Sequence, residues 1–342
     1  MLPQQLPSWE HVIRHHAIRA TDAYEIAVAA DRARRPQVDT GYRLYWMRQG
    51  FLASHEIVAR PDAYVVVGRH TQCDVVIDDE RTVSLRHALV RCTSTDDGAP
   101  VLSVVDLKTN EGFELSDGTK QHSIAATGSV VFRIGVHSIV ALPSTGTIPD
   151  HLPMPIVDRV VQPAKPAPGG PQVVMQSALP PRAQPQSHLH SRPVSRITLM
   201  PMTGDLAERR SVWPGEPAPF SALPGGEPYL YEISLEPHGS ARRRAIVRLT
   251  GADLDQGLLI GRADKCVDEG LRAILSGGIS RVHVLLVRER GVCRLYDVAS
   301  MNGTYVGSER IRCIPLADEG TTVTLLRSGG ATLTWRSLVS LH

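Results

Sequence analysis

Two stretches of this chain repeat one order of residues, and this repeat constrains the fold more than any other feature. The first contains "VVVGRHTQCDVVIDDERTVSLRHALVRC" and then "VVDLKTNEGFEL". The second contains "LLIGRADKCVDEGLRAILSGGISRVHVLLVRE" and then "LYDVASMNGTYV". In each, an apolar run precedes Gly-Arg, a Cys follows that Arg by four residues, Ser-x-x-His opens a further apolar run, and an Asp precedes a Gly by six residues. Chance is a poor explanation, so the sequence predicts two domains of one kind.

Both copies have the pattern of β-strands. Short runs rich in Val, Ile and Tyr alternate with clusters of Gly, Asp, Thr and Asn, over about 42–142 and again from about 229 to the end. Low aromatic content, 5%, beside 28 Gly and 25 Pro also favours β-rich domains over a helical bundle. The N-terminal stretch from about Trp9 to Arg35 differs, because it lacks Gly and predicts one or two short helices, with Thr21 as a candidate N-cap. The predicted fold class is all-β: two β-sandwiches and a short helical N-terminal segment.

The predicted domain order is a helical extension over 1–40, a β-sandwich over 41–145, a Pro-rich linker over 146–225 and a second β-sandwich over 226–342. Most of the chain's 25 prolines fall in the linker. Such a composition buries too little apolar area to offset its ordering entropy, so a disordered or polyproline-like tether is expected. Two apolar islands in it, "QVVMQ" and "RITLMPM", are candidates for docking on a neighbouring domain.

The bulk properties exclude several classes of protein. A formal net charge of +2 shows no bias toward nucleic acid or membrane surfaces. The five cysteines are scattered and form no C-x-x-C pair, so neither a disulfide scaffold nor a metal site is indicated. No stretch reaches the roughly 18 apolar residues that span a bilayer, and no secretory signal is evident, so a cytoplasmic location is expected. No cofactor is indicated.

The repeated residues of the second copy have the chemistry of an anion site. Arg262 follows an apolar strand, Ser280 opens the next, and Ser300 and Asn302 lie in an Asn-Gly turn. Because loops at one end of a sandwich converge, these donors are expected to face one point, as a phosphate requires. The Asn-Gly pair could also be turn chemistry alone. No general base beside the Ser and no P-loop pattern is present, so binding and not catalysis is predicted.

The pattern "GR…SRVH…DVASMNGTYV" resembles that of the forkhead-associated (FHA) domain, a β-sandwich that binds phosphothreonine peptides. The resemblance covers about 229–342 and, more weakly, about 42–145. It implies that Arg262 and Ser280 bind the phosphate, that Arg281 adds a second charge, and that Asn302 binds the peptide backbone. Ser300 is assigned to the same site. The residues implied as structural support are His283, Thr304, Gly261 and Gly303.

Two departures from the family pattern bear on binding strength. Met301 stands where many family members carry a Ser or Thr that contacts the phosphate. The insertion "DEGLRAILSGG" lengthens the loop before Ser280 and could cover or extend the site. The first departure predicts weaker binding, not its loss.

The first copy departs further. It keeps Arg69 and Ser84 as candidate phosphate contacts, with Gly68 and His87 as support. At the turn, however, Glu111 occupies the Asn position; in addition, Phe113 replaces the Thr, Thr109 replaces the Ser, and Asn110 could substitute for the missing Asn if the turn shifts register. A carboxylate near an incoming phosphate repels it. Weakened or altered phosphopeptide binding, or a purely structural role, is therefore predicted.

The resemblance implies an adaptor of Ser/Thr-kinase signalling, not an enzyme. Its expected partner is a phosphothreonine protein, either a Ser/Thr protein kinase or a substrate of one, with no nucleic acid and no membrane span. The chain's own Thr21, Thr198 or Thr203, once phosphorylated, are candidate intramolecular ligands. The alternative, for which Met301 and Glu111 argue, is a phospho-independent scaffold in a multiprotein assembly such as a secretion system.

Overall fold

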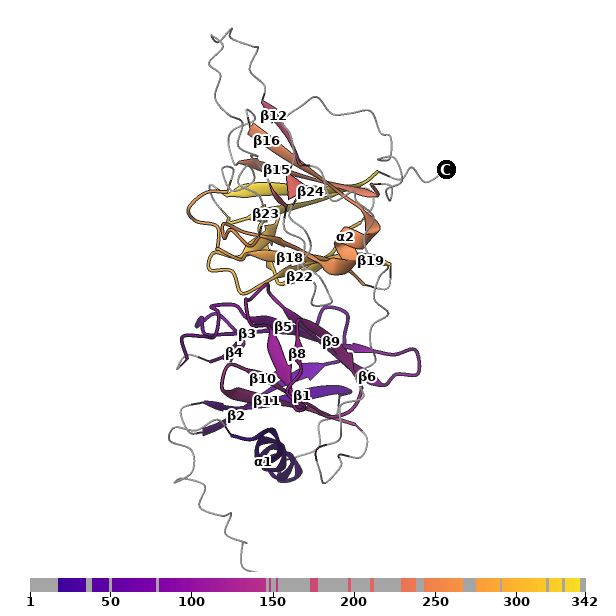
Figure 1. Ribbon diagram of the computed structural model, residues 1–342. Helices are drawn as coiled ribbons and strands as arrows, with labels where there is room; N and C mark the ends of the chain where they lie inside the picture. Colours follow the sequence, from indigo (N-terminus) through magenta and orange to yellow (C-terminus); the bar gives the residue numbers. More distant parts are fainter. Residues whose placement is uncertain are drawn as a thin grey trace, which may run out of the picture. The chain divides into compact units, whose positions relative to one another are not determined.

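The computed structural model divides the chain into two compact units, Met1–Val160 and Val161–His342, each considered by itself. Both are built mainly of β-strands, so the all-β prediction is confirmed (Figure 1). The residues that the structure describes are 18–34, 39–48, 51–77, 80–145, 148, 152, 173–177, 196–197, 210–211, 229–237, 243–266, 275–289, 291–317, 320–327 and 330–338.

The first unit is a sandwich of two sheets. The six-stranded sheet has the order β2 (Phe51–Val58), β1 (Gly41–Arg48), β11 (His137–Pro143), β10 (Val130–Ile134), β7 (Phe113–Leu115) and β8 (Lys120–Gln121). The five-stranded sheet has the order β4 (Val75–Val76), β3 (Tyr64–Gly68), β5 (Ala88–Ser94), β6 (Pro100–Asp106) and β9 (Ser123–Ala126). Side chains from both sheets, such as Leu44 and Val90, share one buried core, as alternation along strands requires.

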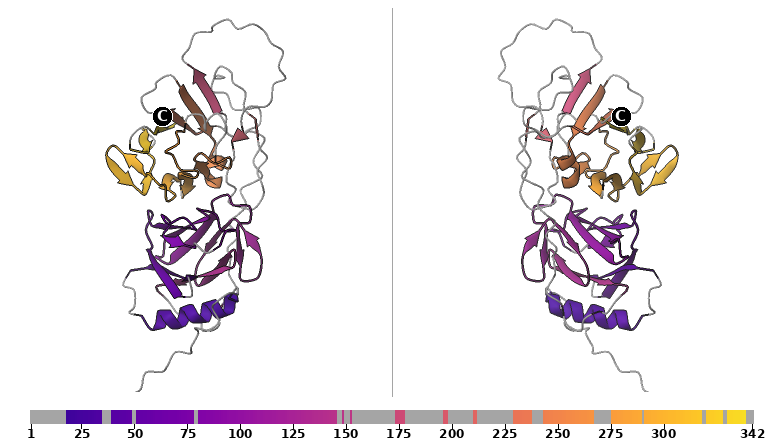
Figure 2. Two further views of the ribbon diagram at one scale, coloured as in Figure 1. Left: turned by 90° about the vertical axis from the view of Figure 1, so that its left-hand side faces the viewer. Right: turned by 90° about the vertical axis from the view of Figure 1, so that its right-hand side faces the viewer.

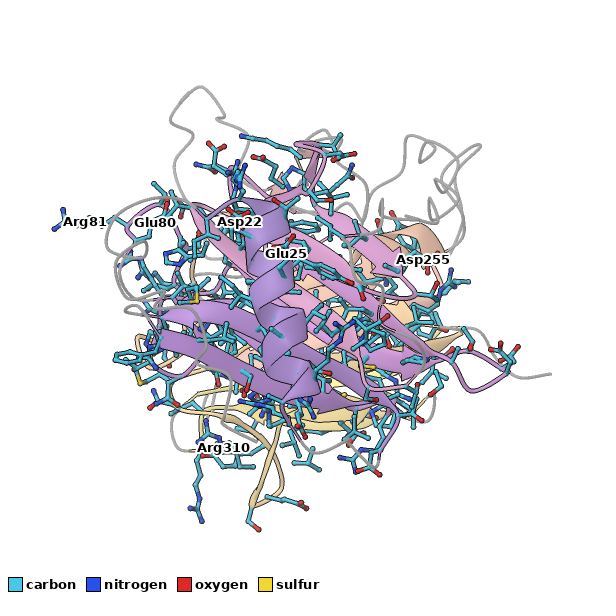
Figure 3. All side chains as sticks on the ribbon, turned by 90° about the horizontal axis from the view of Figure 1, so that it is seen from below. Asp22, Glu25, Glu80, Arg81, Asp255 and Arg310 are labelled. Atoms are coloured by element: carbon cyan, nitrogen blue, oxygen red, sulfur yellow. The ribbon has the colours of Figure 1, made fainter. Side chains whose placement is uncertain are left out.

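The N-terminal helix belongs to this unit. Helix α1 (Ala20–Arg32) lies across the outer face of the six-stranded sheet (Figures 2 and 3). Its buried residues recur at helical spacing and pack on four side chains of β1, β10 and β11. These contacts join Ala23, Tyr24, Ala27 and Val28 of the helix to Tyr45, Val131, Val140 and Leu142 of the sheet. The stretch assigned to a separate extension is thus partly a layer of the first domain.

The helix begins earlier than expected. Its N-cap is Arg19, and Thr21 lies inside the first turn, so the prediction of Thr21 as N-cap is wrong. Asp22 lies in the first turn, where an acidic side chain is favourable, and its carboxylate accepts from Arg19 Nε at 3.0 Å. Thr21 is left exposed on the helix surface.

The second unit repeats the two-sheet plan. One sheet has the order β12 (Val173–Ser177), β16 (Arg243–Leu249), β15 (Tyr231–Pro237), β24 (Ala331–Ser337), β23 (Thr321–Leu325), β20 (Thr304–Val306) and β21 (Glu309–Ile311). The other has the order β17 (Leu258–Ile260), β18 (Val284–Glu289), β19 (Val292–Asp297) and β22 (Cys313–Pro315). A short helix, α2 (Gly251–Gln256), precedes β17 and starts with a capping box between Thr250 and Asp253.

The two apolar islands of the linker behave differently. Val173–Gln176 of "QVVMQ" lie in β12, which pairs antiparallel with β16, Val174 opposite Ile246, so the expected docking is confirmed for these residues. "RITLMPM" contributes β13 (Arg196–Ile197), which pairs instead with β14 (Arg210–Ser211) of the linker itself. The predicted disorder of the remaining linker concerns residues outside the described ranges. In the part of the chain that is described, no helix is long and apolar enough to cross a membrane.

Candidate functional site

Loops between the strands of the second unit bring the predicted residues together. The backbone N–H of Arg262 donates to Ser280 O at 3.2 Å, and Arg262 Nε donates to Ile279 O. The N–H of Met301 donates to Ser280 Oγ at 2.9 Å. Arg262 at the end of β17, Ser280 before β18 and the turn between β19 and β20 therefore meet at one end of the sandwich.

This end of the domain presents hydrogen-bond donors. Arg262, Arg281 and Asn302 are exposed, whereas Ser280 is 8% exposed. Ser280 Oγ accepts from Met301, which leaves its own hydrogen to donate. Asn302 Nδ2 donates to Gly278 O at 2.7 Å, so the Asn side chain also ties the turn to the loop before Ser280. The inserted residues 267–274 of that loop lie outside the described ranges.

Asp297 organises the turn. Its buried carboxylate accepts from Ser300 N at 2.7 Å, from Ser300 Oγ at 2.5 Å and from Thr304 Oγ1 at 2.6 Å. Ser300 and Thr304 are completely buried. The structure therefore places Ser300 inside the turn, away from the surface where Arg262 and Asn302 lie.

His283 links the same loops from the interior of the domain. Its Nδ1 accepts from Ser280 N at 3.1 Å, which puts the hydrogen on Nε2, and Nε2 lies 3.1 Å from Gly303 O. The ring is completely buried. One imidazole thus fixes the backbone on both sides of the site.

Steric contacts explain why glycine occupies positions 68 and 261. A Cβ on Gly261 would lie 2.2 Å from Arg281 O, and one on Gly68 would lie 2.5 Å from Leu85 O. The loop that opens with Ser-x-x-His packs directly on this backbone, so no side chain fits. Gly303 has φ 81°, a conformation that disfavours side chains.

The first unit repeats the His and Arg bonds of this framework. Ser84 N donates to His87 Nδ1 at 3.2 Å, and His87 Nε2 lies 2.7 Å from Gly112 O. Arg69 is exposed and its Nε donates to Val83 O at 2.8 Å. Thr109 takes the place of Ser300, with Oγ1 donating to Asp106 Oδ1 at 2.6 Å. The repeat seen in the sequence is therefore also a repeat of the site's internal bonds.

At the Thr position the two copies differ. Phe113 is buried against Phe132, with ring centroids 5.8 Å apart, and offers no hydroxyl to Asp106. The imidazole of His122 fills that role, with Nδ1 3.0 Å from Asp106 Oδ2. This bond raises the pKa of His122 above its ordinary value.

The pKa of His122 predicts a pH dependence. Because the folded-state pKa is raised, protonated His122 stabilises the first domain fully below about pH 6.5, and this contribution is lost as the pH rises through the folded value. We expect the first domain's Tm to fall by roughly 2–4 °C across that range. Thermal unfolding of the wild type and His122→Asn as a function of pH measures it; the same slope in both would contradict the assignment.

At the Asn position the first copy carries an ion pair. Glu111 Oε2 lies 2.5 Å from Lys120 Nζ, and both side chains are exposed. The hydrogen bond from Lys120 lowers the pKa of Glu111, which keeps the carboxylate charged. Asn110 is exposed beside it. An acceptor thus stands where the second copy presents the Asn302 amide.

Three features were not evident from the sequence as functional. The sequence marks Asp106 and Asp297 only as the residues that precede the turns, whereas in the structure their carboxylates hold the turns through hydrogen bonds. No sequence motif includes Arg310, whose Nη2 donates to Ser300 O at 3.3 Å from the neighbouring strand β21, a contact that depends on the hairpin register. Equivalent thiols, Cys73 and Cys266, donate to the loop carbonyls of Leu85 and Arg281 at 3.3 and 3.2 Å.

Four of the five cysteines, Cys73, Cys92, Cys266 and Cys293, are buried, whereas Cys313 is partly exposed. Burial raises the pKa of the Cys73 thiol to about 12. Within the described ranges, no group of three or more His, Cys, Asp or Glu is placed to hold a metal ion.

Both units are therefore β-sandwiches whose Gly-Arg, Ser-x-x-His and Asp-turn segments build one donor-rich loop end. The family model described as "FHA domain" matches residues 65–125 and 258–325, and the chain contains two FHA domains. A search of curated protein sequences gave no match.

Solved FHA domains are similar to this chain. The FHA domain of CT664 from Chlamydia trachomatis is 16% identical, with a TM-score of 0.26, covering 30% of this chain and 96% of its own. The FHA-1 domain of Rv1747 from Mycobacterium tuberculosis is 20% identical, with a TM-score of 0.24, covering 30% and 97%. EmbR from the same organism, in complex with a low-affinity phosphopeptide, is 20% identical, with a TM-score of 0.25, covering 36% and 30%.

Proposed function

We propose that the C-terminal FHA domain binds phosphothreonine peptides and that the chain is an adaptor in Ser/Thr-kinase signalling. FHA domains are phosphopeptide-binding modules. The observation that carries the proposal is the exposed Arg262 beside the Ser280 hydroxyl, with Asn302 on the adjoining turn. A guanidinium fork and a hydroxyl supply charge-assisted bonds to a phosphate, and the amide is free to bond a peptide backbone through its carbonyl oxygen and second N–H.

The summed charge of four equivalent positions differs between the two domains. The C-terminal site has Arg262, Arg281 and Arg310 with the neutral Asn302, a formal charge of +3. The equivalent positions of the N-terminal site are Arg69, Leu85, Lys120 and Glu111, a formal charge of +1. A phosphate dianion is therefore attracted more strongly to the C-terminal site.

We assign the N-terminal domain a weaker phosphopeptide affinity through Arg69 and Ser84, or a structural role. In the C-terminal domain Ser300 acts through the turn, because its hydroxyl is buried on Asp297. Thr21 is the intramolecular candidate that the structure describes; it is exposed but helical, so its backbone bonds compete with binding. Thr198 and Thr203 lie outside the described ranges.

A phospho-independent scaffold remains the second candidate function. Met301 favours it, because this apolar side chain is 54% exposed at the site and suits an apolar partner surface. Titration of the full chain with a degenerate phosphothreonine peptide library and with the same library unphosphorylated tests the proposal. Binding of the phosphorylated form alone supports the adaptor, and equal binding of both supports the scaffold.

Met301 also gives a prediction of gained affinity. Met301→Thr places a hydroxyl next to the phosphate contacts, where it can donate one charge-assisted bond worth about 1 kcal/mol, or roughly fivefold in Kd. Fluorescence anisotropy with a library-selected phosphopeptide measures the change. Met301→Val, which matches the shape of Thr without its hydroxyl, serves as the control. Equal affinities for the two variants would contradict the role given to the hydroxyl.

A further inference from the structure

Arg310 lies across the turn that carries Asn302. It stands on β21 opposite Tyr305 of β20 and reaches back so that its Nη2 donates to Ser300 O at 3.3 Å. A Cβ on Gly303 would lie 2.6 Å from Arg310 Nε, so the guanidinium covers the backbone of Gly303. The residue is exposed, and Figure 3 labels it beside its hairpin.

The charge of Arg310 has no carboxylate partner among the described residues, and its one hydrogen bond there goes to a backbone carbonyl. The equivalent cation of the first domain, Lys120, stands opposite Glu114 in the same hairpin register and forms its ion pair with Glu111. Glu111 occupies the position of Asn302. The first domain therefore neutralises Lys120 with its own carboxylate, whereas the second domain has a neutral amide at this position next to Arg310.

The other two arginines lie on the phosphate side. Arg262 is joined to Ser280 by its backbone, and Arg281 follows Ser280 directly. Arg310 contacts the opposite flank of the same turn, beyond Asn302. A peptide held by its phosphate at Ser280 and by its backbone at Asn302 would therefore pass over Arg310 with a residue next to the phosphothreonine. Four further N–H donors remain on the guanidinium for that residue.

We propose that Arg310 makes the C-terminal domain selective for phosphothreonine peptides with a nearby acidic residue, Asp or Glu. This residue lies in the part of the peptide that passes over Gly303. This inference rests on the proposed phosphothreonine binding and deepens it. In the first domain the cation equivalent to Arg310, Lys120, pairs with a carboxylate, that of Glu111. By analogy, we assign a carboxylate of the bound peptide to Arg310.

The test uses the full chain and a phosphothreonine peptide with neutral flanks. A single Asp is placed at each flanking position in turn, with Asn at the same position as the neutral match. We expect Asp at one position to tighten Kd about fivefold relative to Asn, and this gain to shrink at high salt. Arg310→Gln is expected to remove the gain, so that the ratio of the Asn-peptide Kd to the Asp-peptide Kd falls from about five to about one. The weaker binding that follows from the lost charge is shared by both peptides and cancels in this ratio.

Two variants control the result. Arg310→Lys keeps the charge without the fork and should retain part of the gain, which separates charge from any loosening of the turn. Lys120→Gln, the matched change in the first domain, should leave the gain intact.

Four results would overturn the inference, and they can be told apart. Equal affinity for Asp and Asn peptides at every position, or a gain that survives Arg310→Gln, overturns the inference while phosphothreonine binding stands. If a second phosphothreonine at a flanking position tightened binding but Asp at the same position did not, the preferred group would not be a carboxylate, and the inference would be overturned. No binding of any phosphothreonine peptide overturns the proposed function, and this inference with it.

Discussion

Arg262→Ala is expected to abolish measurable phosphopeptide binding by the C-terminal domain. The Arg262 side chain is exposed and oriented by the bond from its Nε to Ile279 O, so its remaining donors are preorganised for a phosphate. Losing two charge-assisted bonds costs about 3–4 kcal/mol, or more than about a hundredfold in Kd. Isothermal titration calorimetry with a library-selected phosphothreonine peptide measures this loss.

The matched change in the other domain controls for general charge effects. Arg69→Ala removes an exposed arginine with the same kind of backbone bond, from Nε to Val83 O at 2.8 Å. We expect it to leave the high-affinity binding unchanged. If Arg69→Ala caused the larger loss, the assignment of the principal site to the C-terminal domain would be wrong.

Asp297→Ala is expected to give the largest loss of stability. The buried carboxylate accepts from the Ser300 N–H and from the hydroxyls of Ser300 and Thr304. Truncation leaves these donors without their acceptor in a buried turn, which costs about 3–5 kcal/mol. Urea unfolding followed by fluorescence, with the buried Trp335 as a reporter in the second unit, measures the free energy of unfolding.

Double variants show whether the effect passes through these donors. In Asp297→Ala, the further change Thr304→Val should cost much less than Thr304→Val alone, because the hydroxyl has already lost its acceptor. Additive losses would show that the stability of the turn does not depend on this bond.

Much of the fold could be predicted because its signals are local. Apolar runs separated by Gly, Asp and Asn mark the strands, and the repeated Gly-Arg and Ser-x-x-His segments mark the loops that meet. Gly261 is readable from sequence for a physical reason, since only glycine tolerates Arg281 O at that distance.

The rest could not be predicted because it depends on contacts across strands. Arg310 meets Ser300 through the register of a hairpin. His122 replaces a hydroxyl that Phe113 cannot supply, from a strand end well downstream. Ser300 was expected at the ligand surface, yet its side chain turns inward to Asp297, a choice that depends on side-chain packing and not on spacing.

The structure of the linker could likewise be predicted only in part. Its Pro-rich composition predicts a tether, and the docking of "QVVMQ" was expected in outline. Which edge it pairs with, β16 of the second domain, follows from the unpaired backbone groups that an edge strand offers.

The most direct test of the account compares one phosphothreonine peptide, selected from a degenerate library, with its unphosphorylated and phosphoserine forms on the full chain. The account predicts micromolar or tighter binding of the phosphothreonine form, binding of the unphosphorylated form weaker by at least about a hundredfold, and loss of the former in Arg262→Ala. Equal binding of the phosphorylated and unphosphorylated peptides, unaffected by Arg262→Ala, would contradict it.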